Sequence, residues 1–314
     1  IEYTSRGYKG EVLWSDPWLF ETDYRFRARL YALTREHEGY SKRELGFQPS
    51  LARNITKQWE VSAFLLAKQV EFTDFTIDPP ELLGRQKYLA NSAGFSSTLD
   101  FRNNAANPSR GFIGTATLDA ASSVLGSEVE FVRGTFRLSY YLPVTRRTVL
   151  AFGARGGVIA PTGGSATTTV ATRRKMRALR TRQNADLIAQ NDTRLPIDER
   201  FFSGGSTSVR SFVERDLGPK DRNGLPLGGE AFTVFNVEYN FPIFGDVKGA
   251  VFADAGNLKS RADDFGISDL RYAFGAGVRY NLPFGPIRLD YGLNPSPRAD
   301  EDRGAFHLSI GVAF

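Results

Sequence analysis

Alternation of large apolar residues with small or polar ones is the strongest pattern in this sequence. Between residues 271 and 282, one face would carry Tyr272, Phe274, Ala276, Val278, Tyr280 and Leu282. The intervening positions hold only small or polar residues and two arginines. Segment 306–314 repeats the pattern, with one face formed by Phe306, Leu308, Ile310, Val312 and Phe314. A period of two is typical of β-strands, so the chain is predicted to be all-β.

The same alternation, read along the whole chain, predicts about thirteen strands. They lie near residues 8–14, 24–30, 43–53, 58–72, 92–102, 111–121, 132–140, 148–159, 231–241, 247–255, 271–282, 286–292 and 306–314. Residues 160–230 interrupt the series with a long polar stretch. This places eight strands before the interruption and five after it.

Composition excludes several other classes of protein. The sequence has no run of 18 apolar residues and a mean hydropathy of −0.31, which excludes spanning helices. The 25 Phe, 12 Tyr and 3 Trp are too many for a disordered chain. With no Cys and two His, thiolate and histidine-rich metal sites are excluded, and we expect no cofactor. The net charge of +5 comes from 40 basic and 35 acidic residues along the whole chain and does not indicate nucleic acid.

The two faces of the predicted strands decide between a soluble sandwich and a membrane barrel. One face carries bulky aromatic residues up to both strand ends, and the other carries Gly, Ser, Thr and Arg. Aromatic residues at both ends of strands of about ten residues are typical of the girdles of transmembrane barrels. Only a closed barrel lets strands cross lipid with every backbone group paired. We therefore predict a transmembrane antiparallel β-barrel.

A motif after the long polar stretch identifies a family. Residues 200–212 read Arg-Phe-Phe-Ser-Gly-Gly-Ser-Thr-Ser-Val-Arg-Ser-Phe, and this segment resembles the Gly-Gly…Val-Arg-Gly-Phe loop of the BamA/TamA family of outer-membrane assembly factors. The similarity continues through segments 228–230, 235–242, 251–257, 275–279 and 285–292. Upstream, the Asp-Phe-Arg-Asn-Asn of residues 100–104 and the Asn-Pro-Ser-Arg-Gly of residues 107–111 also resemble this family.

The resemblance implies that residues 160–230 form an extracellular loop that folds back into the lumen. The loop motif would be Gly204, Gly205, Val209, Arg210 and Phe212. Acidic residues on the inner wall would receive the arginine, and Glu238 and Asp254 stand at suitable positions of the polar faces of their strands. The family has Gly where this chain has Ser211, so the local backbone is expected to differ there.

The resemblance also assigns a role to the final strand. The strand that carries Phe306, Leu308, Ile310, Val312 and Phe314 resembles the recognition signal of outer-membrane proteins. In assembly factors it forms one side of a seam with the first strand, where an incoming strand can add to the sheet. The alternative is that these residues only face lipid.

The family barrel has sixteen strands, with its conserved loop after the eleventh. Eight strands precede the loop here, so the first three strands of a 16-stranded barrel are expected to be absent, together with the periplasmic POTRA domains. Residues 1–314 would then be one membrane β-barrel domain that is either a fragment or completed by another polypeptide.

The resemblance favours a protein of the bacterial outer membrane that assembles or inserts β-barrel proteins without covalent chemistry. Its partners would be outer-membrane lipids, unfolded β-barrel clients and, as an open possibility, accessory assembly subunits. A two-partner-secretion-type translocator and a passive porin are the alternatives. We expect no enzyme, because His307 has no acid beside it in sequence and is interpreted as a lumenal polar residue. The basic run of residues 173–182 has two interpretations, a solvated loop or a surface for anionic lipid headgroups.

Overall fold

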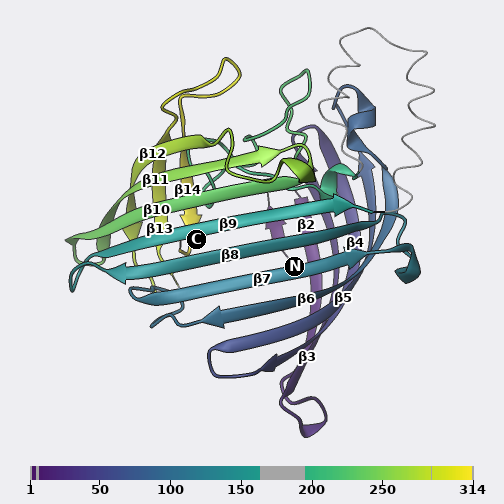
Figure 1. Ribbon diagram of the computed structural model, residues 1–314, viewed down its shortest axis with the longest axis horizontal. Coiled ribbons are helices and arrows are strands. Elements are labelled where there is room, and N and C mark those ends of the chain that lie inside the picture. Colours follow the sequence, from purple (N-terminus) through teal and green to yellow (C-terminus); the bar gives the residue numbers. More distant parts are fainter. Residues whose placement is uncertain (1, 5–6, 163–194, 284, 313–314) are drawn as a thin grey trace.

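The computed structural model describes residues 2–4, 7–162, 195–283 and 285–312. The strands in these segments form one antiparallel sheet (Figure 1). Each strand pairs with its neighbours in chain order. The strands are β1 (Glu2–Thr4), β2 (Gly7–Asp16), β3 (Tyr24–His37), β4 (Tyr40–Asn54), β5 (Trp59–Thr73), β6 (Lys87–Asp100), β7 (Gly111–Ala121), β8 (Phe131–Pro143), β9 (Val149–Pro161), β10 (Ala231–Phe244), β11 (Val247–Lys259), β12 (Arg271–Tyr280), β13 (Ile287–Leu293) and β14 (Gly304–Ile310).

The predicted all-β antiparallel fold is confirmed, and the predicted strands correspond to β2–β14. The three-residue β1 was not predicted, because it is too short to show an alternating pattern. In the described segments, five short 3-10 helices lie between strands: η1 (Leu19–Glu21), η2 (Pro80–Leu83), η3 (Ser123–Leu125), η4 (Ile197–Glu199) and η5 (Ala262–Asp264). None of the helices in the described part of the chain is long and apolar enough to cross a membrane.

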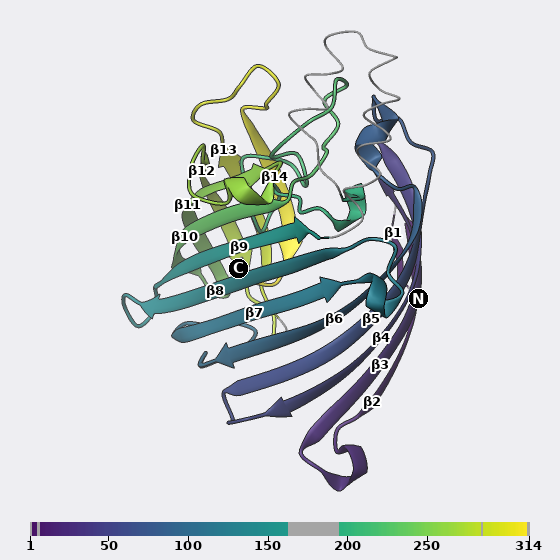
Figure 2. The same cartoon turned by 45° about the vertical axis from the view of Figure 1, so that its right-hand side comes forward.

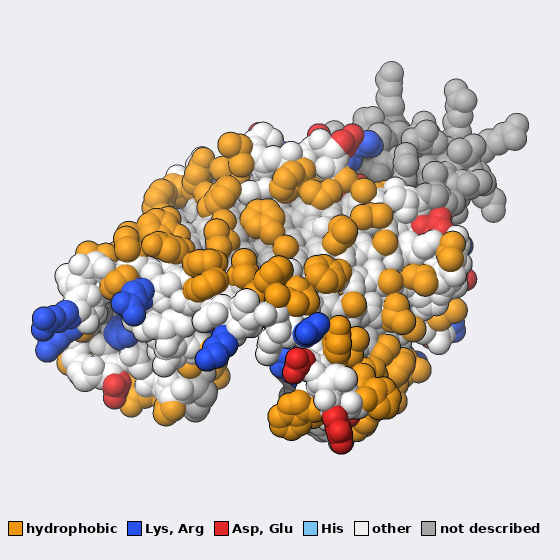
Figure 3. All heavy atoms as spheres, turned by 60° about the horizontal axis from the view of Figure 1, so that its bottom comes forward, with side chains coloured by type: hydrophobic (Ala, Val, Ile, Leu, Met, Phe, Trp, Pro, Cys, Tyr) orange, Lys and Arg blue, Asp and Glu red, His pale blue; other side chains and the backbone are white. Residues whose placement is uncertain are grey.

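The sheet curls strongly, so that it has a convex and a concave side (Figure 2). Alternation follows this curvature in β12, where Tyr272, Phe274 and Tyr280 are each about half exposed on the convex side, whereas Ala273 and Arg279 are buried on the concave side. Figure 3 shows apolar side chains spread across the outer face of the sheet. The apolar face therefore points outward, as it must in a barrel that meets lipid.

The concave side holds the apolar core together with residues 195–230. One cluster joins the ends of β4–β9 to the loop residues Leu195, Ile197 and Leu227, all of which are almost completely buried. Among the described strands, no pairing joins β1 to β14, so the sheet remains open within this chain. We call the concave space the lumen, the strand ends near residues 161 and 231 the loop end, and the opposite ends the turn end.

The last strand is shorter than the alternation predicted. β14 ends at Ile310, and Gly311 follows with a φ of 101°, a conformation that breaks the extended backbone. Val312 therefore lies beyond the strand, which corrects the prediction of a continuous strand to the end of segment 306–314. Phe314 and the basic run of residues 173–182 lie outside the described residues.

Candidate functional site

A compact turn presents the loop motif to the inner wall. Gly204 and Gly205 have φ values of 101° and 100°, which side chains rarely tolerate, and a Cβ on Gly204 would lie 2.5 Å from the carbonyl oxygen of Val213. The amide of Gly205 donates to the carbonyl oxygen of Phe212 at 3.0 Å, which closes the turn. The two glycines therefore set the direction in which residues 206–212 leave the turn.

Two apolar residues of the motif anchor the turn against the wall. Val209 is fully buried and Phe212 nearly so, and both pack with Leu217, with Leu258 of β11 and with Ala273 of β12. Gly256 of β11 allows this approach, because a Cβ there would lie 2.9 Å from a methyl carbon of Val209. Burial of these side chains fixes the positions of the two residues between them, Arg210 and Ser211.

Arg210 forms hydrogen bonds with both predicted acidic partners, Glu238 and Asp254. Its Nε and Nη2 donate to the two carboxylate oxygens of Asp254 at 2.9 and 2.8 Å, and its Nη1 donates to Oε2 of Glu238 at 2.6 Å. The backbone amide of Arg210 also donates to Asp254 at 3.1 Å. Only 1% of Arg210 is exposed, so protein groups surround the guanidinium in place of water. These groups are the carboxylates and the ring of Phe252, whose centroid lies 3.4 Å from the guanidinium carbon.

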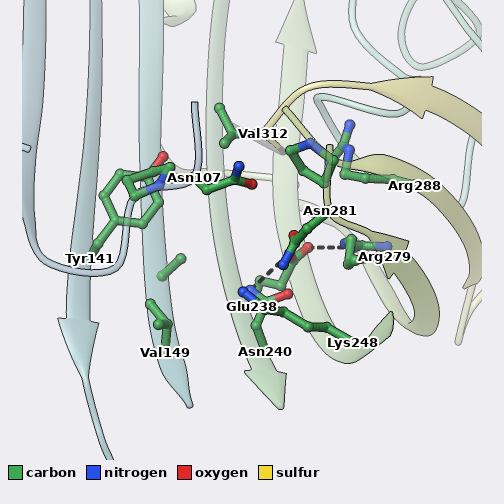
Figure 4. A pocket seen from close by; sticks show the side chains of 13 residues that line it. Asn107, Tyr141, Val149, Glu238, Asn240, Lys248, Arg279, Asn281, Arg288 and Val312 are labelled. Atoms are coloured by element: carbon green, nitrogen blue, oxygen red, sulfur yellow. Dashed lines mark hydrogen bonds and ion pairs between the residues drawn. The ribbon is translucent and has the colours of Figure 1, made fainter. Parts of the chain in front are cut away.

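Further wall residues extend this contact into a balanced ionic network. Arg279 of β12 donates to Glu238 at 2.9 Å and to Asp290 of β13 at 2.5 Å, and Figure 4 shows the bond between Arg279 and Glu238. Asp290 Oδ2 also lies 3.7 Å from Arg210 Nη1 and 4.0 Å from Arg288 Nη1. Three guanidinium groups thus meet three carboxylates. Because each charge has a partner of opposite sign, the network offsets much of the cost of burial.

Sequence reasoning assigned no role to Arg279, Asp290 or Phe252. Arg279 and Asp290 belong to the polar faces of their strands. Knowledge of the strand register would have placed these residues close together, because Asp290 lies opposite Gly277 on the strand of Arg279. In the same way, Phe252 lies opposite Glu238. A Cβ on Gly277 would lie 2.0 Å from Asp290 Oδ1, so this glycine makes room for the ionic network. Register between neighbouring strands depends on turn geometry, which alternation within a single strand does not specify.

Ser211 occupies the family's glycine position without a positive φ. Its hydroxyl donates to the carbonyl oxygen of Tyr272 in β12 at 3.0 Å. The serine side chain therefore adds a bond between the loop and the wall.

The start of the described loop has a second ionic anchor on the opposite part of the sheet. Asp198 of η4 lies 2.6 Å from Lys42 of β4, and Glu199 lies 2.8 Å from Lys68 of β5. Tyr88 of β6 donates to Glu199 at 3.0 Å. Burial would raise the pKa of Asp198, but the charges of Lys68 and Lys42 outweigh this effect and lower it to about 2. The loop therefore connects β4–β6 to β10–β13 across the lumen.

The terminal strand contacts the loop on one face and is exposed on the other. His307 lies on the lumenal face, where its Nε2 is 3.0 Å from the carbonyl oxygen of Arg210. Phe306, Leu308 and Ile310 are 73%, 76% and 69% exposed, more than the outward residues of β12. Val312 lines a small cavity at the turn end, with Asn107, Tyr141 and Arg288 (Figure 4).

The chemistry available at this site is electrostatic and conformational. Within the described ranges, no group of three or more His, Asp or Glu side chains could hold a metal ion. The site instead combines a buried ionic network, a loop that it holds, and a terminal strand that the loop contacts.

Comparison with known proteins agrees with this architecture. Residues 1–314 match the Omp85 superfamily domain. The outer membrane protein assembly factor BamA of Nitratidesulfovibrio vulgaris is 22% identical over 308 residues, which cover 96% of this chain and 35% of that protein. The mouse sorting and assembly machinery component 50 homolog is 26% identical over 211 residues, covering 62% of this chain and 39% of that protein. The chain thus spans little more than a third of the length of these relatives.

Solved structures show the same fold. The crystal structure of BamA from Haemophilus ducreyi lacking POTRA domains 1–3 has a TM-score of 0.75 at 15% identity, over 98% of this chain and 62% of that chain. CdiB from Acinetobacter baumannii has a TM-score of 0.54 at 14% identity, over 96% of this chain and 49% of that chain. Because the family domain matches the entire sequence, the protein belongs to the Omp85 superfamily, as a BamA/TamA-type β-barrel domain of an outer membrane.

Proposed function

We propose that this chain is the membrane domain of a factor that inserts β-barrel proteins into the outer membrane without covalent chemistry. The observation that carries the proposal is the superfamily match over the whole chain, together with relatives named as assembly factors. Exposed sheet edges and contacts with lipid would promote the insertion. The clients would be unfolded β-barrel proteins, and the partners would be outer-membrane lipids and accessory assembly subunits.

The terminal strand supports a mechanism of strand addition. Within the described residues, β14 pairs only with β13, so its other edge offers backbone donors and acceptors. Such an edge can template an incoming strand, which gains backbone hydrogen bonds as it forms. Phe306, Leu308 and Ile310 would face lipid beside this edge and would lead the client strand into the apolar layer.

In this proposal the loop motif keeps the working edge in place. Gly204, Gly205, Val209 and Phe212 would orient Arg210, and Glu238 and Asp254 would retain it in the lumen. The contact from His307 to the carbonyl oxygen of Arg210 supports a coupling between the loop and β14. A loop inside the lumen also favours an assembly factor over an open porin.

Reconstitution of the full-length protein in liposomes tests the proposal. An unfolded β-barrel client is added, and its folding is followed by the shift in gel mobility between folded and heat-unfolded forms. We expect faster folding than in empty liposomes, and slower folding with the Arg210→Ala variant. Equal folding rates with and without the protein would count against an insertion factor.

Two further readouts separate the alternative functions. Delivery of a soluble client into the liposome interior would favour a two-partner-secretion-type translocator. Large, steady single-channel currents from the full-length protein would favour a passive porin.

A further inference from the structure

Two arginines lie opposite each other on the lumenal side of the sheet, near the middle of strands β8 and β9. Arg137 of β8 and Arg155 of β9 are direct cross-strand partners in the antiparallel register. Their neighbours Phe136, Leu138 and Phe152 point outward and are each about two-fifths exposed. Strand alternation therefore places both guanidinium groups on the lumenal side. Directly opposed side chains have Cβ atoms about 4.5–5.5 Å apart, and like charges in this arrangement destabilise a sheet.

Three other cations on the lumenal side of the sheet, Arg133, Lys42 and Lys68, have carboxylate partners. Arg133, four residues before Arg137 on the same face of β8, forms two hydrogen bonds with Asp119 at 3.0 and 2.8 Å. Lys42 and Lys68 bind Asp198 and Glu199. Among the described residues, no carboxylate lies within 4.0 Å of Arg137 or Arg155. The arginine pair therefore differs from these three cations, whose charges are compensated by carboxylates.

Arg155 is the more constrained member of the pair. Only 9% of it is exposed, and its Nε and Nη2 atoms are buried without a hydrogen-bond partner in the described structure. The residue opposite Arg155 on β10 is Val234, and the residue opposite Arg137 on β7 is Thr115. Neither can supply a negative charge. Buried, unpaired guanidinium donors are costly unless an anion accepts their hydrogen bonds.

The lumenal carboxylate of β11 is already engaged. Asp254 accepts two side-chain bonds from Arg210 and one from Asn236 at 2.8 Å. The charge of Asp254 is therefore balanced by Arg210, and the positive charges of Arg137 and Arg155 remain uncompensated.

We propose that Arg137 and Arg155 form a lumenal binding site for a phosphate group. Two guanidinium forks present donors in the planar geometry that suits phosphate oxygens. A phosphate carries between one and two negative charges at neutral pH and so balances the two cations better than a single carboxylate, which carries only one. Arg137 is exposed to the lumen and provides the entry side, while Arg155 provides the buried side. The site is independent of the proposed insertion function.

Isothermal titration of the full-length protein in an uncharged detergent tests the site. Inorganic phosphate is titrated at constant ionic strength, which is kept with sodium chloride so that charge screening is the same throughout. We expect one saturable site per chain, and binding at least tenfold weaker in the Arg137→Ser variant. Arg137 has high exposure and its loss removes a like-charge contact, so this variant is expected to fold.

Arg53→Ser is the matched control, because it removes one positive charge from an exposed position of β4. Arg53→Ser should bind phosphate as the unmodified protein does. Gel mobility of unheated samples verifies that both variants are folded. Absence of saturable phosphate binding, or equal affinity in the Arg137→Ser variant, would overturn the proposal.

A competition arm identifies the source of the phosphate. Dihexanoyl phosphatidic acid, a short-chain lipid, is added before the titration. Displacement of inorganic phosphate by this lipid supports a site for lipid headgroups. Phosphate binding that the lipid does not affect supports a site for free phosphate.

Discussion

The imidazole of His307 lies 3.0 Å from the backbone carbonyl oxygen of Arg210, so Nε2 of the last strand donates to the loop motif. Gly292 on the neighbouring strand β13 makes the same approach possible, since a Cβ there would lie 2.2 Å from that carbonyl oxygen. The arginine is therefore held by its side chain on β10 and β11 and by its backbone on β13 and β14. We therefore expect movement of the loop and movement of the terminal strand to be coupled through this one residue.

Replacing His307 tests this coupling. His307→Leu removes the donor to Arg210 and should cost about 1 kcal/mol, the usual contribution of one hydrogen bond. We expect faster hydrogen exchange of the backbone amides of β14, measured by mass spectrometry on the full-length protein. His307→Gln retains an N–H donor and should show slower exchange than His307→Leu. Identical exchange in the two variants would argue against a role for the bond.

The bidentate geometry of Arg210 predicts that charge alone cannot replace it. Arg210→Ala leaves Asp254 and Glu238 buried with fewer partners, and we expect a loss of roughly 3–5 kcal/mol in the free energy of unfolding. Arg210→Lys keeps the charge but cannot bind both carboxylates in the same fork geometry, so it should recover only part of the loss. Urea unfolding in liposomes, followed by fluorescence of the three Trp, measures both variants. Full recovery with lysine would contradict this interpretation.

Gly292→Ala tests the close approach between wall and loop. The added methyl group would collide with the carbonyl oxygen of Arg210, and the backbone on both sides leaves little room for adjustment. We expect a lower midpoint of urea unfolding and weaker protection of residues 203–212 from protease. Gly10→Ala is the control, because a Cβ on Gly10 in β2 meets no atom within 4 Å. Equal effects of the two substitutions would show that the close contact between Gly292 and the carbonyl oxygen of Arg210 does not determine stability.

Much of this architecture follows from the sequence, and the remainder depends on distances between strands. Alternation predicted β12 almost to the residue, because Tyr272–Tyr280 separates lipid and lumen without exception. The second anchor at Asp198 and Glu199 was not predicted, since its partners Lys42 and Lys68 lie more than 100 residues away. No local pattern states which lumenal lysine a loop carboxylate will meet. The opposed pair Arg137 and Arg155 likewise emerges only from the register of β8 with β9.

The second anchor predicts how the stability of the loop changes with acid. The pKa of Asp198 is lowered to about 2, below its ordinary value of 3.8, because Lys68 and Lys42 stabilise the charged form more than burial disfavours it. A lowered pKa contributes stability that is complete above the ordinary value and is lost as the pH falls through the lowered one. We expect unfolding experiments to show this contribution, roughly 2 kcal/mol, at pH 7 and its loss between about pH 4 and pH 2.

Asp198→Asn isolates this effect. The variant should be less stable than the unmodified protein at pH 7, and the difference should narrow as the pH approaches 2. Asp23→Asn is the control, because the ion pair of Asp23 with Arg53 is long, at 3.9 Å, and the Asp23 side chain is 85% exposed. A difference between Asp198→Asn and the unmodified protein that does not change with pH would rule out the titration of Asp198 as the cause.

At the turn end, Asn107 joins two distant parts of the wall. Its side-chain amide donates to the carbonyl oxygen of Leu282 at 3.1 Å, and Figure 4 shows Asn107 between the wall at Tyr141 and the wall at Arg279. Hydrogen bonds within the turn stabilise it, since the side-chain oxygen of Asn103 accepts from the amides of Ser109 and Arg110 at 3.0 Å. Removal of the Asn107 amide should therefore loosen the contact between the two turns without unfolding either.

Spin labels measure this contact directly, and the absence of Cys allows labels at chosen positions only. Ala105→Cys and Pro283→Cys place one label on each turn, at exposed positions. Adding Asn107→Ala should broaden the distance distribution between the labels, because one hydrogen bond of about 1 kcal/mol is lost. Asn54→Ala, in an exposed position at another turn, should leave it unchanged. If the distribution stays narrow without the Asn107 amide, packing of the turns rather than this bond holds the turn end together.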